Sequence, residues 1–121
     1  MAGPLRFSAL HTWAREEDDG TVSVGITDHA QYELGELQYL GLPRTGSVVT
    51  RDAAFGEVES AKTACELYAP CSGTVVAVNL ELAGDPAAVN RDPYGTGWMI
   101  RIMPSDRQEL RLLLDEAIHG E

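Results

Sequence analysis

Lys62 is the residue whose type and setting point most directly to chemistry, because it is the only lysine among 121 residues. It sits among small residues, in the segment Ser60-Ala61-Lys62-Thr63-Ala64. A lysine amine can be acylated, and acylation removes its charge. A single lysine in such a segment indicates a site of covalent modification. The alternative is an unmodified surface lysine in a solvated acidic loop.

The segments on either side of Lys62 are the elements that must position it. Residues 54–58 and 73–78 have the composition of short strands, and the small polar residues between them are typical of a turn. We therefore predict that Lys62 projects from a hairpin tip, where the active site of another enzyme can reach it. Carboxylates lie just outside the turn, at Glu57, Glu59 and Glu66.

The rest of the chain predicts a mainly β domain. Alternating apolar and polar residues predict further strands at 7–13, 21–26 (half-buried), 36–42, 46–49 and 97–103. Residues 27–35 predict a short helix, capped by Asp28 and ended by Gly35. A C-terminal helix is expected from residue 104 onward, with Ser105 as its cap. Its apolar stripe comprises Leu110, Leu113, Leu114 and Ile118.

Composition excludes several classes of function. The net charge of −10 disfavours nucleic-acid binding and adsorption to an anionic membrane surface, and it suits partners with basic docking faces. No apolar run approaches the roughly 20 residues needed to span a bilayer. The first residues lack an apolar signal segment. We expect a cytoplasmic protein, or one in an organelle matrix after loss of a transit segment.

Neither a metal site nor a catalytic constellation is predicted. Cys65 and Cys71 do not have zinc-ligand spacing, and the three histidines are widely spread, at positions 11, 29 and 119. The simplest interpretation of the cysteines is that they serve as small apolar residues. No nucleophile and base can be paired from the sequence, so the chain is not expected to be an enzyme on its own.

Ordered segments along nearly the whole chain carry a resemblance to a known family. Around the lysine they are Glu59-Ser60-Ala61-Lys62, Tyr68-Ala69-Pro70, Ser72-Gly73 and Val78-Asn79. Elsewhere they are His11, Trp13, the run from Val24 to Gln31, Leu34-Gly35, Leu42-Pro43, Gly46, Val89-Asn90, Pro93-Tyr94 and Gly97-Trp98. In this order the segments resemble the glycine cleavage system H-protein family, and Lys62 occupies the place of its lipoyl-bearing lysine.

The resemblance implies a fold, a cofactor and a set of partners. It implies one lipoyl-carrier domain over residues 1–121, with a barrel-sandwich hybrid fold of the lipoyl/biotinyl type and the two helices outside. Lys62 would bear lipoate in amide linkage, with Glu59, Ser60, Glu66 and Glu33 near the arm. The chain would be a non-catalytic carrier of an aminomethyl intermediate. Its partners would be a PLP-dependent glycine decarboxylase, an aminomethyltransferase, dihydrolipoyl dehydrogenase and a lipoate ligase or lipoyltransferase.

Two departures from the family pattern leave alternatives open. Where the family has His-Glu-Trp, this chain has His11-Thr12-Trp13, and a serine found in some members is Leu10 here. The thiols of Cys65 and Cys71 also lie near the arm in sequence. These features fit an H-like lipoate-binding protein that carries sulfur intermediates for a heterodisulfide-reductase-like sulfur oxidation system. A third interpretation is a β binding module whose lysine is never modified.

Overall fold

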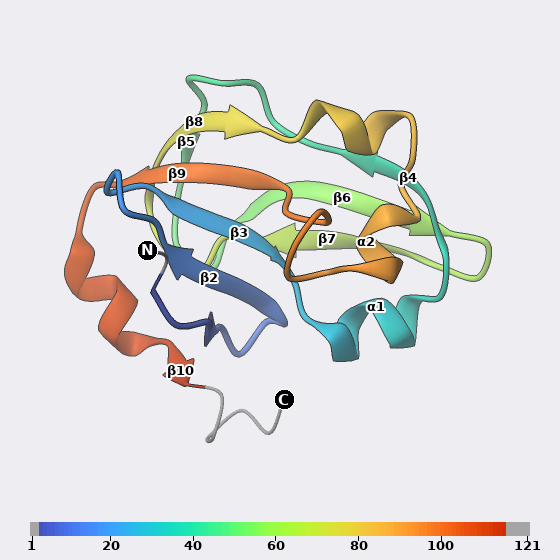
Figure 1. The fold of residues 1–121 in the computed structure, drawn as a ribbon, viewed down its shortest axis with the longest axis horizontal. Coiled ribbons are helices and arrows are strands. Elements are labelled where there is room, and N and C mark those ends of the chain that lie inside the picture. Colours follow the sequence, from blue (N-terminus) through green and yellow to red (C-terminus); the bar gives the residue numbers. More distant parts are fainter. Residues whose placement is uncertain (1–2, 116–121) are drawn as a thin grey trace.

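The computed structural model describes residues 3–115 and is built mainly of β-strands (Figure 1). The strands are β1 (Arg6–Phe7), β2 (Thr12–Glu16), β3 (Val22–Ile26), β4 (Leu37–Gly41), β5 (Val48–Val49), β6 (Ala54–Ser60), β7 (Ala64–Tyr68), β8 (Gly73–Val78), β9 (Ile100–Pro104) and β10 (Leu114–Asp115). The helices are α1 (Asp28–Leu34) and α2 (Ala88–Arg91), with 3-10 turns η1 (Leu80–Ala83) and η2 (Arg107–Leu112). Within the described residues, no helix is long and apolar enough to cross a membrane.

Two antiparallel sheets enclose one hydrophobic core. The larger sheet has the order β10-β1-β2-β3-β9-β8-β5, and the smaller has the order β4-β6-β7. The core takes side chains from both, such as Val24 and Ile100 from the first and Val58 and Leu67 from the second. Full burial of a side chain of this size stabilises the fold by about 1.5–3 kcal/mol. The architecture confirms the predicted barrel-sandwich class.

The hairpin that carries Lys62 differs from the prediction in its second strand. β6 pairs with β7, whereas the expected partner at 73–78 is β8, which pairs with β9 and β5. The sequence of β7 hides its strand character because Leu67 is its only buried residue. The turn itself lies at residues 61–63, so the predicted place of Lys62 at a hairpin tip is confirmed.

The predicted first strand at 7–13 is wrong, because the chain turns back between Phe7 and Thr12. Ser8 causes the reversal: its Oγ accepts hydrogen bonds from the N–H groups of Leu10 and Thr12, both at 3.2 Å. His11 adopts a positive φ of 69° within this turn. A short polar side chain that bonds to its own neighbouring backbone competes with the strand ladder.

Helix α1 forms where predicted but begins on a different cap. The hydroxyl of Thr27, not the carboxylate of Asp28, accepts from Ala30 N–H at 3.1 Å. Asp28 instead accepts from the side-chain amide of Gln31 at 2.9 Å. Gly35 ends the helix with a φ of 81°, which confirms the predicted stop.

Two further expectations need correction. The strand predicted at 21–26 as half-buried forms as β3, but all five of its residues are buried. The C-terminal helix is the 3-10 turn η2, capped by Asp106 rather than Ser105. Leu110 is buried as expected, Leu114 belongs to β10, and Ile118 lies outside the described residues.

Candidate functional site

Lys62 lies at the tip of the β6–β7 hairpin, which projects at the right of Figure 1. Ser60 shapes this tip through its backbone and its side chain. Its N–H donates to Thr63 O at 2.8 Å, and its Oγ accepts from the N–H groups of Lys62 at 3.4 Å and Thr63 at 3.3 Å. The hydroxyl of the predicted site residue Ser60 therefore contacts the peptide unit that carries the lysine.

The side chain of Lys62 is exposed, and among residues 3–115 no hydrogen bond or ion pair engages its ammonium. Its stem lies beside the end of α1, since a Cβ built on Gly35 would be 3.6 Å from Lys62 Cε. The lysine is thus held next to the helix end while its amine stays accessible for chemistry.

Carboxylates surround the hairpin on its exposed face. Glu59 is the cross-strand partner of both Tyr39 on β4 and Ala64 on β7. Glu57 and Glu66 are direct partners on β6 and β7, so two like charges face each other. Like charges at opposed positions destabilise a sheet. The tip is acidic even though no carboxylate of residues 3–115 is paired with Lys62.

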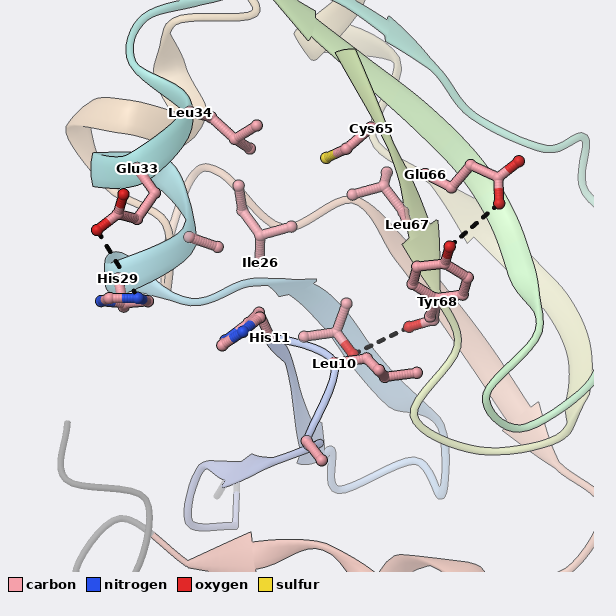
Figure 2. A pocket seen from close by; sticks show the side chains of 13 residues that line it. Leu10, His11, Ile26, His29, Glu33, Leu34, Cys65, Glu66, Leu67 and Tyr68 are labelled. Atoms are coloured by element: carbon pink, nitrogen blue, oxygen red, sulfur yellow. Dashed lines mark hydrogen bonds and ion pairs between the residues drawn. The ribbon is translucent and has the colours of Figure 1, made fainter. Parts of the chain in front are cut away.

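A cavity of about 380 Å³ opens next to the hairpin, between α1, β7 and the turn at residues 8–12 (Figure 2). Its walls are mainly apolar. Cys65 and Leu67 extend into it from β7, and Leu34 and Ile26 face them from the opposite side. Three segments far apart in sequence therefore build one apolar space beside the only lysine.

The two predicted carboxylates Glu33 and Glu66 both border this cavity, on opposite sides. Glu33 lies on α1, 4.0 Å from His29 Nε2, and both side chains are more than half exposed. Glu66 accepts from the Tyr68 hydroxyl at 3.3 Å, and its carboxylate points away from the cavity. The negative charge of Glu66 raises the pKa of Tyr68.

Thr12 stands where the family pattern has a glutamate, and its hydroxyl is already engaged. Thr12 is buried, and its Oγ1 donates to Tyr68 O at 3.0 Å and lies 2.7 Å from Ser8 Oγ. The side chain therefore joins the turn at 8–12 to β7. It gives the cavity no charge.

The pairing of His11 with His29 is a feature that sequence reasoning missed. Their ring centroids lie 5.6 Å apart at the cavity border. The chain separates them by 18 positions, and the strained turn that orients His11 has no simple sequence signal. Within the described part of the chain, no group of three or more ligand-type side chains is placed to hold a metal ion.

The two cysteines lie in different environments. Cys65 is exposed and borders the cavity, whereas Cys71 is fully buried. Burial raises the pKa of the Cys65 thiol. Burial also raises the pKa of Cys71 to about 12, with a further increase from the carboxylate of Glu109. Their proximity in sequence thus does not make them one site.

Comparisons with known proteins agree on one family. A model of the family described as glycine cleavage H-protein matches residues 5–120. The glycine cleavage system H protein of Psychrobacter sp. is 51% identical over 110 residues, which cover 91% of this chain and 87% of that protein. The H protein of Mycobacterium avium is 46% identical over 97% of this chain and 89% of its own length. A crystal structure of the H protein from Mycobacterium marinum superposes with a TM-score of 0.85 at 36% identity, covering 98% of both chains.

Proposed function

The chain belongs to the glycine cleavage H-protein family, a family of lipoyl carriers, and we propose that Lys62 is the residue that carries the lipoyl group. The observation that supports this assignment is the setting of the lysine. Its amine is exposed and unpaired on a tight hairpin tip, next to an apolar cavity. Acylation of the amine would break no ion pair within residues 3–115. The methylene groups of the acyl chain could pack against the apolar walls of the cavity.

The residues around Lys62 fit lipoate in three ways. Ser60 fixes the turn, so the attachment atom has a defined starting point. Gly35, at the end of α1, lies beside the lysine stem without crowding it. Leu34 and Leu67, both buried, offer apolar surface in the cavity wall. When bound, lipoate supplies a dithiolane that can be opened by reduction, loaded and reoxidised.

We propose that the carboxylates at the cavity border receive the polar end of a loaded arm. An amine buried without a hydrogen-bond partner loses about 1–3 kcal/mol, so an apolar cavity alone would not shelter it. Glu33 and Glu66 are the carboxylates of the described residues that border the cavity. Thr12 is neutral and engaged, and the Glu66 carboxylate points away from the cavity toward the Tyr68 hydroxyl. Glu33 is therefore the better placed of the two to act in place of the family carboxylate, and Glu66 could act only after its side chain turns toward the cavity.

The glycine cleavage role is favoured over the sulfur-oxidation alternative. The matching relatives carry the name glycine cleavage system H protein, at 46–51% identity over most of the chain. The structure also weakens the thiol argument, because Cys71 is fully buried away from the cavity that Cys65 borders. A paired role for the two thiols in sulfur transfer has no geometric support.

We propose that residues 1–121 act as one carrier domain that catalyses nothing alone. Its partners are then a PLP-dependent glycine decarboxylase, an aminomethyltransferase and dihydrolipoyl dehydrogenase, with a lipoate ligase or lipoyltransferase for attachment. Tethering to Lys62 raises the effective concentration of the cargo at each docked active site. The cytoplasmic location expected from the sequence stays a prediction.

Intact mass tests the proposal directly. The protein is incubated with a lipoate ligase, ATP and free lipoate, beside the variant Lys62→Arg. We expect one lipoyl increment on the wild type and none on the variant. A wild type without an increment, tested with both a ligase and an octanoyl- and lipoyl-transfer route, would contradict the carrier role.

A further inference from the structure

A second groove, of about 410 Å³, lies between the β4–β5 connection and η1. One wall is formed by Leu40, Leu42 and Pro43, and Val78 contributes to the other. Leu80 borders this groove with 80% of its surface exposed, and Arg44 borders it as an exposed cation. The groove therefore combines apolar walls with one positive charge at its edge.

The guanidinium of Arg44 has no interaction partner among residues 3–115, whereas most arginines of this protein have one. All eight arginines lie within the described residues, and six of them have a hydrogen bond, ion pair or aromatic partner. Neither Arg44 nor Arg111 has a partner for its guanidinium among residues 3–115. In a chain with a net charge of −10, a free guanidinium beside an apolar groove offers a local site for a carboxylate.

Both walls of the groove are held by hydrogen bonds of the fold. On one side Gly46 N–H donates to Val75 O at 2.7 Å, which fixes the connection that carries Arg44. On the other side the buried Asn79 donates from Nδ2 to Thr96 O at 3.0 Å and to Trp98 O at 2.8 Å, just before Leu80. Because the groove is already ordered before binding, little conformational entropy is lost when a partner binds to it.

We propose that this groove docks a segment of one of the enzymes that act on the Lys62 arm, and that the segment presents an apolar side chain next to a carboxylate. The apolar side chain would cover Leu80 and enter the groove, and the carboxylate would pair with Arg44, whose planar guanidinium favours bidentate contacts. The identity of the enzymes rests on the proposed function.

The position of the groove relative to Lys62 supports an enzyme as the occupant. β4 forms part of the groove and pairs with β6, whose last residues lead into the hairpin tip. Gly41 is the cross-strand partner of Glu57, which precedes Lys62 by five residues. At the rise of a β-strand, five residues span about 17 Å. A protein seated in the groove and extending along the β4 edge would reach the lysine and its arm.

The experiment compares two matched pairs of variants. Arg44→Glu and Leu80→Ser change the groove. Arg111→Glu and Leu112→Ser change an arginine and a leucine on η2 that are also exposed. Dissociation constants are measured for glycine decarboxylase, aminomethyltransferase and dihydrolipoyl dehydrogenase, with lipoylated and with unmodified protein. We expect each groove variant to weaken binding of the same enzyme by about tenfold or more, and the η2 variants by less than about twofold.

Equal effects of the two pairs, or no effect of the groove variants on any of the three enzymes, would overturn the proposal. The proposal would also be overturned if the wild type self-associates, and if Arg44→Glu abolishes this self-association but leaves enzyme binding intact. The groove would then be an interface with a second copy of the chain. The lipoyl increment in the intact mass reports on the proposed function separately. Because binding is also measured without lipoate, a failure of attachment does not hide the result for the groove.

Discussion

The stem of Lys62 lies against the end of helix α1 at Gly35, where an added Cβ would be 3.6 Å from Lys62 Cε. That distance is an ordinary van der Waals contact, so a methyl group at position 35 would not displace the lysine. The cost of a side chain there comes from the backbone instead, because Gly35 has a φ of 81°.

Gly35→Ala should therefore destabilise the fold by about 1–3 kcal/mol without blocking attachment of lipoate, because a φ of 81° with a ψ of −171° is a conformation essentially restricted to glycine. Chemical denaturation measures the first effect, and intact mass after exhaustive lipoylation measures the second. Gly84→Ala is the matched control, since Gly84 has a φ of −91° and open space around it. A variant at position 35 that keeps its stability but cannot be lipoylated would show that contact with the stem matters more than the backbone.

Ser60→Ala should slow attachment of lipoate by about three- to tenfold, because the turn loses the hydroxyl that accepts from Lys62 N–H and Thr63 N–H. Ser60→Thr keeps the hydroxyl and should restore most of the rate. Initial rates of ligase-dependent lipoylation provide the measurement. Ser105→Ala, at an exposed serine outside the hairpin, should change nothing. If Ser60→Thr is as slow as Ser60→Ala, the role of the hydroxyl is refuted.

Glu57→Arg should stabilise the protein by about 0.2–1 kcal/mol, because it replaces a like-charge pair with Glu66 by an opposite-charge pair. The gain should shrink at high salt, which screens exposed charges. Urea denaturation at low and high ionic strength tests both statements. Glu16→Arg has the same change in net charge but faces Val22 across the sheet, so it should give a smaller gain.

The buried thiol of Cys71 should make stability fall at alkaline pH. Its pKa is raised to about 12 in the folded protein, from about 9 in an unfolded chain. The folded state therefore holds this proton more tightly, so stability is complete below pH 9 and declines as the pH rises from 9 toward 12. Unfolding of the wild type and of Cys71→Ala across this range should show a shallower decline for the variant. If the free energy of unfolding fell with pH equally steeply in the wild type and in Cys71→Ala, Cys71 would not be the source of the alkaline decline.

Cys65 should react with iodoacetamide far faster than Cys71 in the folded protein, because Cys65 is exposed and Cys71 is fully buried. Peptide mapping by mass spectrometry measures both rates. If the cavity shelters the arm, lipoylation of Lys62 should slow alkylation of Cys65, since this thiol lies in the cavity wall. Equal rates for Cys65 in modified and unmodified protein would argue against occupation of the cavity.

The sequence predicted those features that depend only on residues close together in the chain. Gly35 ends α1 because a positive φ is needed there, and the small residues around Lys62 form a turn because no apolar side chain draws them into the core. The reversal at Ser8 was missed because side-chain to backbone hydrogen bonds override the alternation of residues 7–13. The cavity was not predictable, since α1, β7 and the turn at 8–12 meet only in the folded protein.

The exposed tip also makes Lys62 the only place where a lysine-specific protease can cut this chain. Cleavage would leave fragments 1–62 and 63–121, separated between β6 and β7. Both sheets contain strands of both fragments, which pair with each other at β10–β1, β3–β9, β8–β5 and β6–β7, so the pieces should remain associated after the cut. An unmodified molecule is thus divisible into two complementary halves, and acylation of one amine protects it from that division.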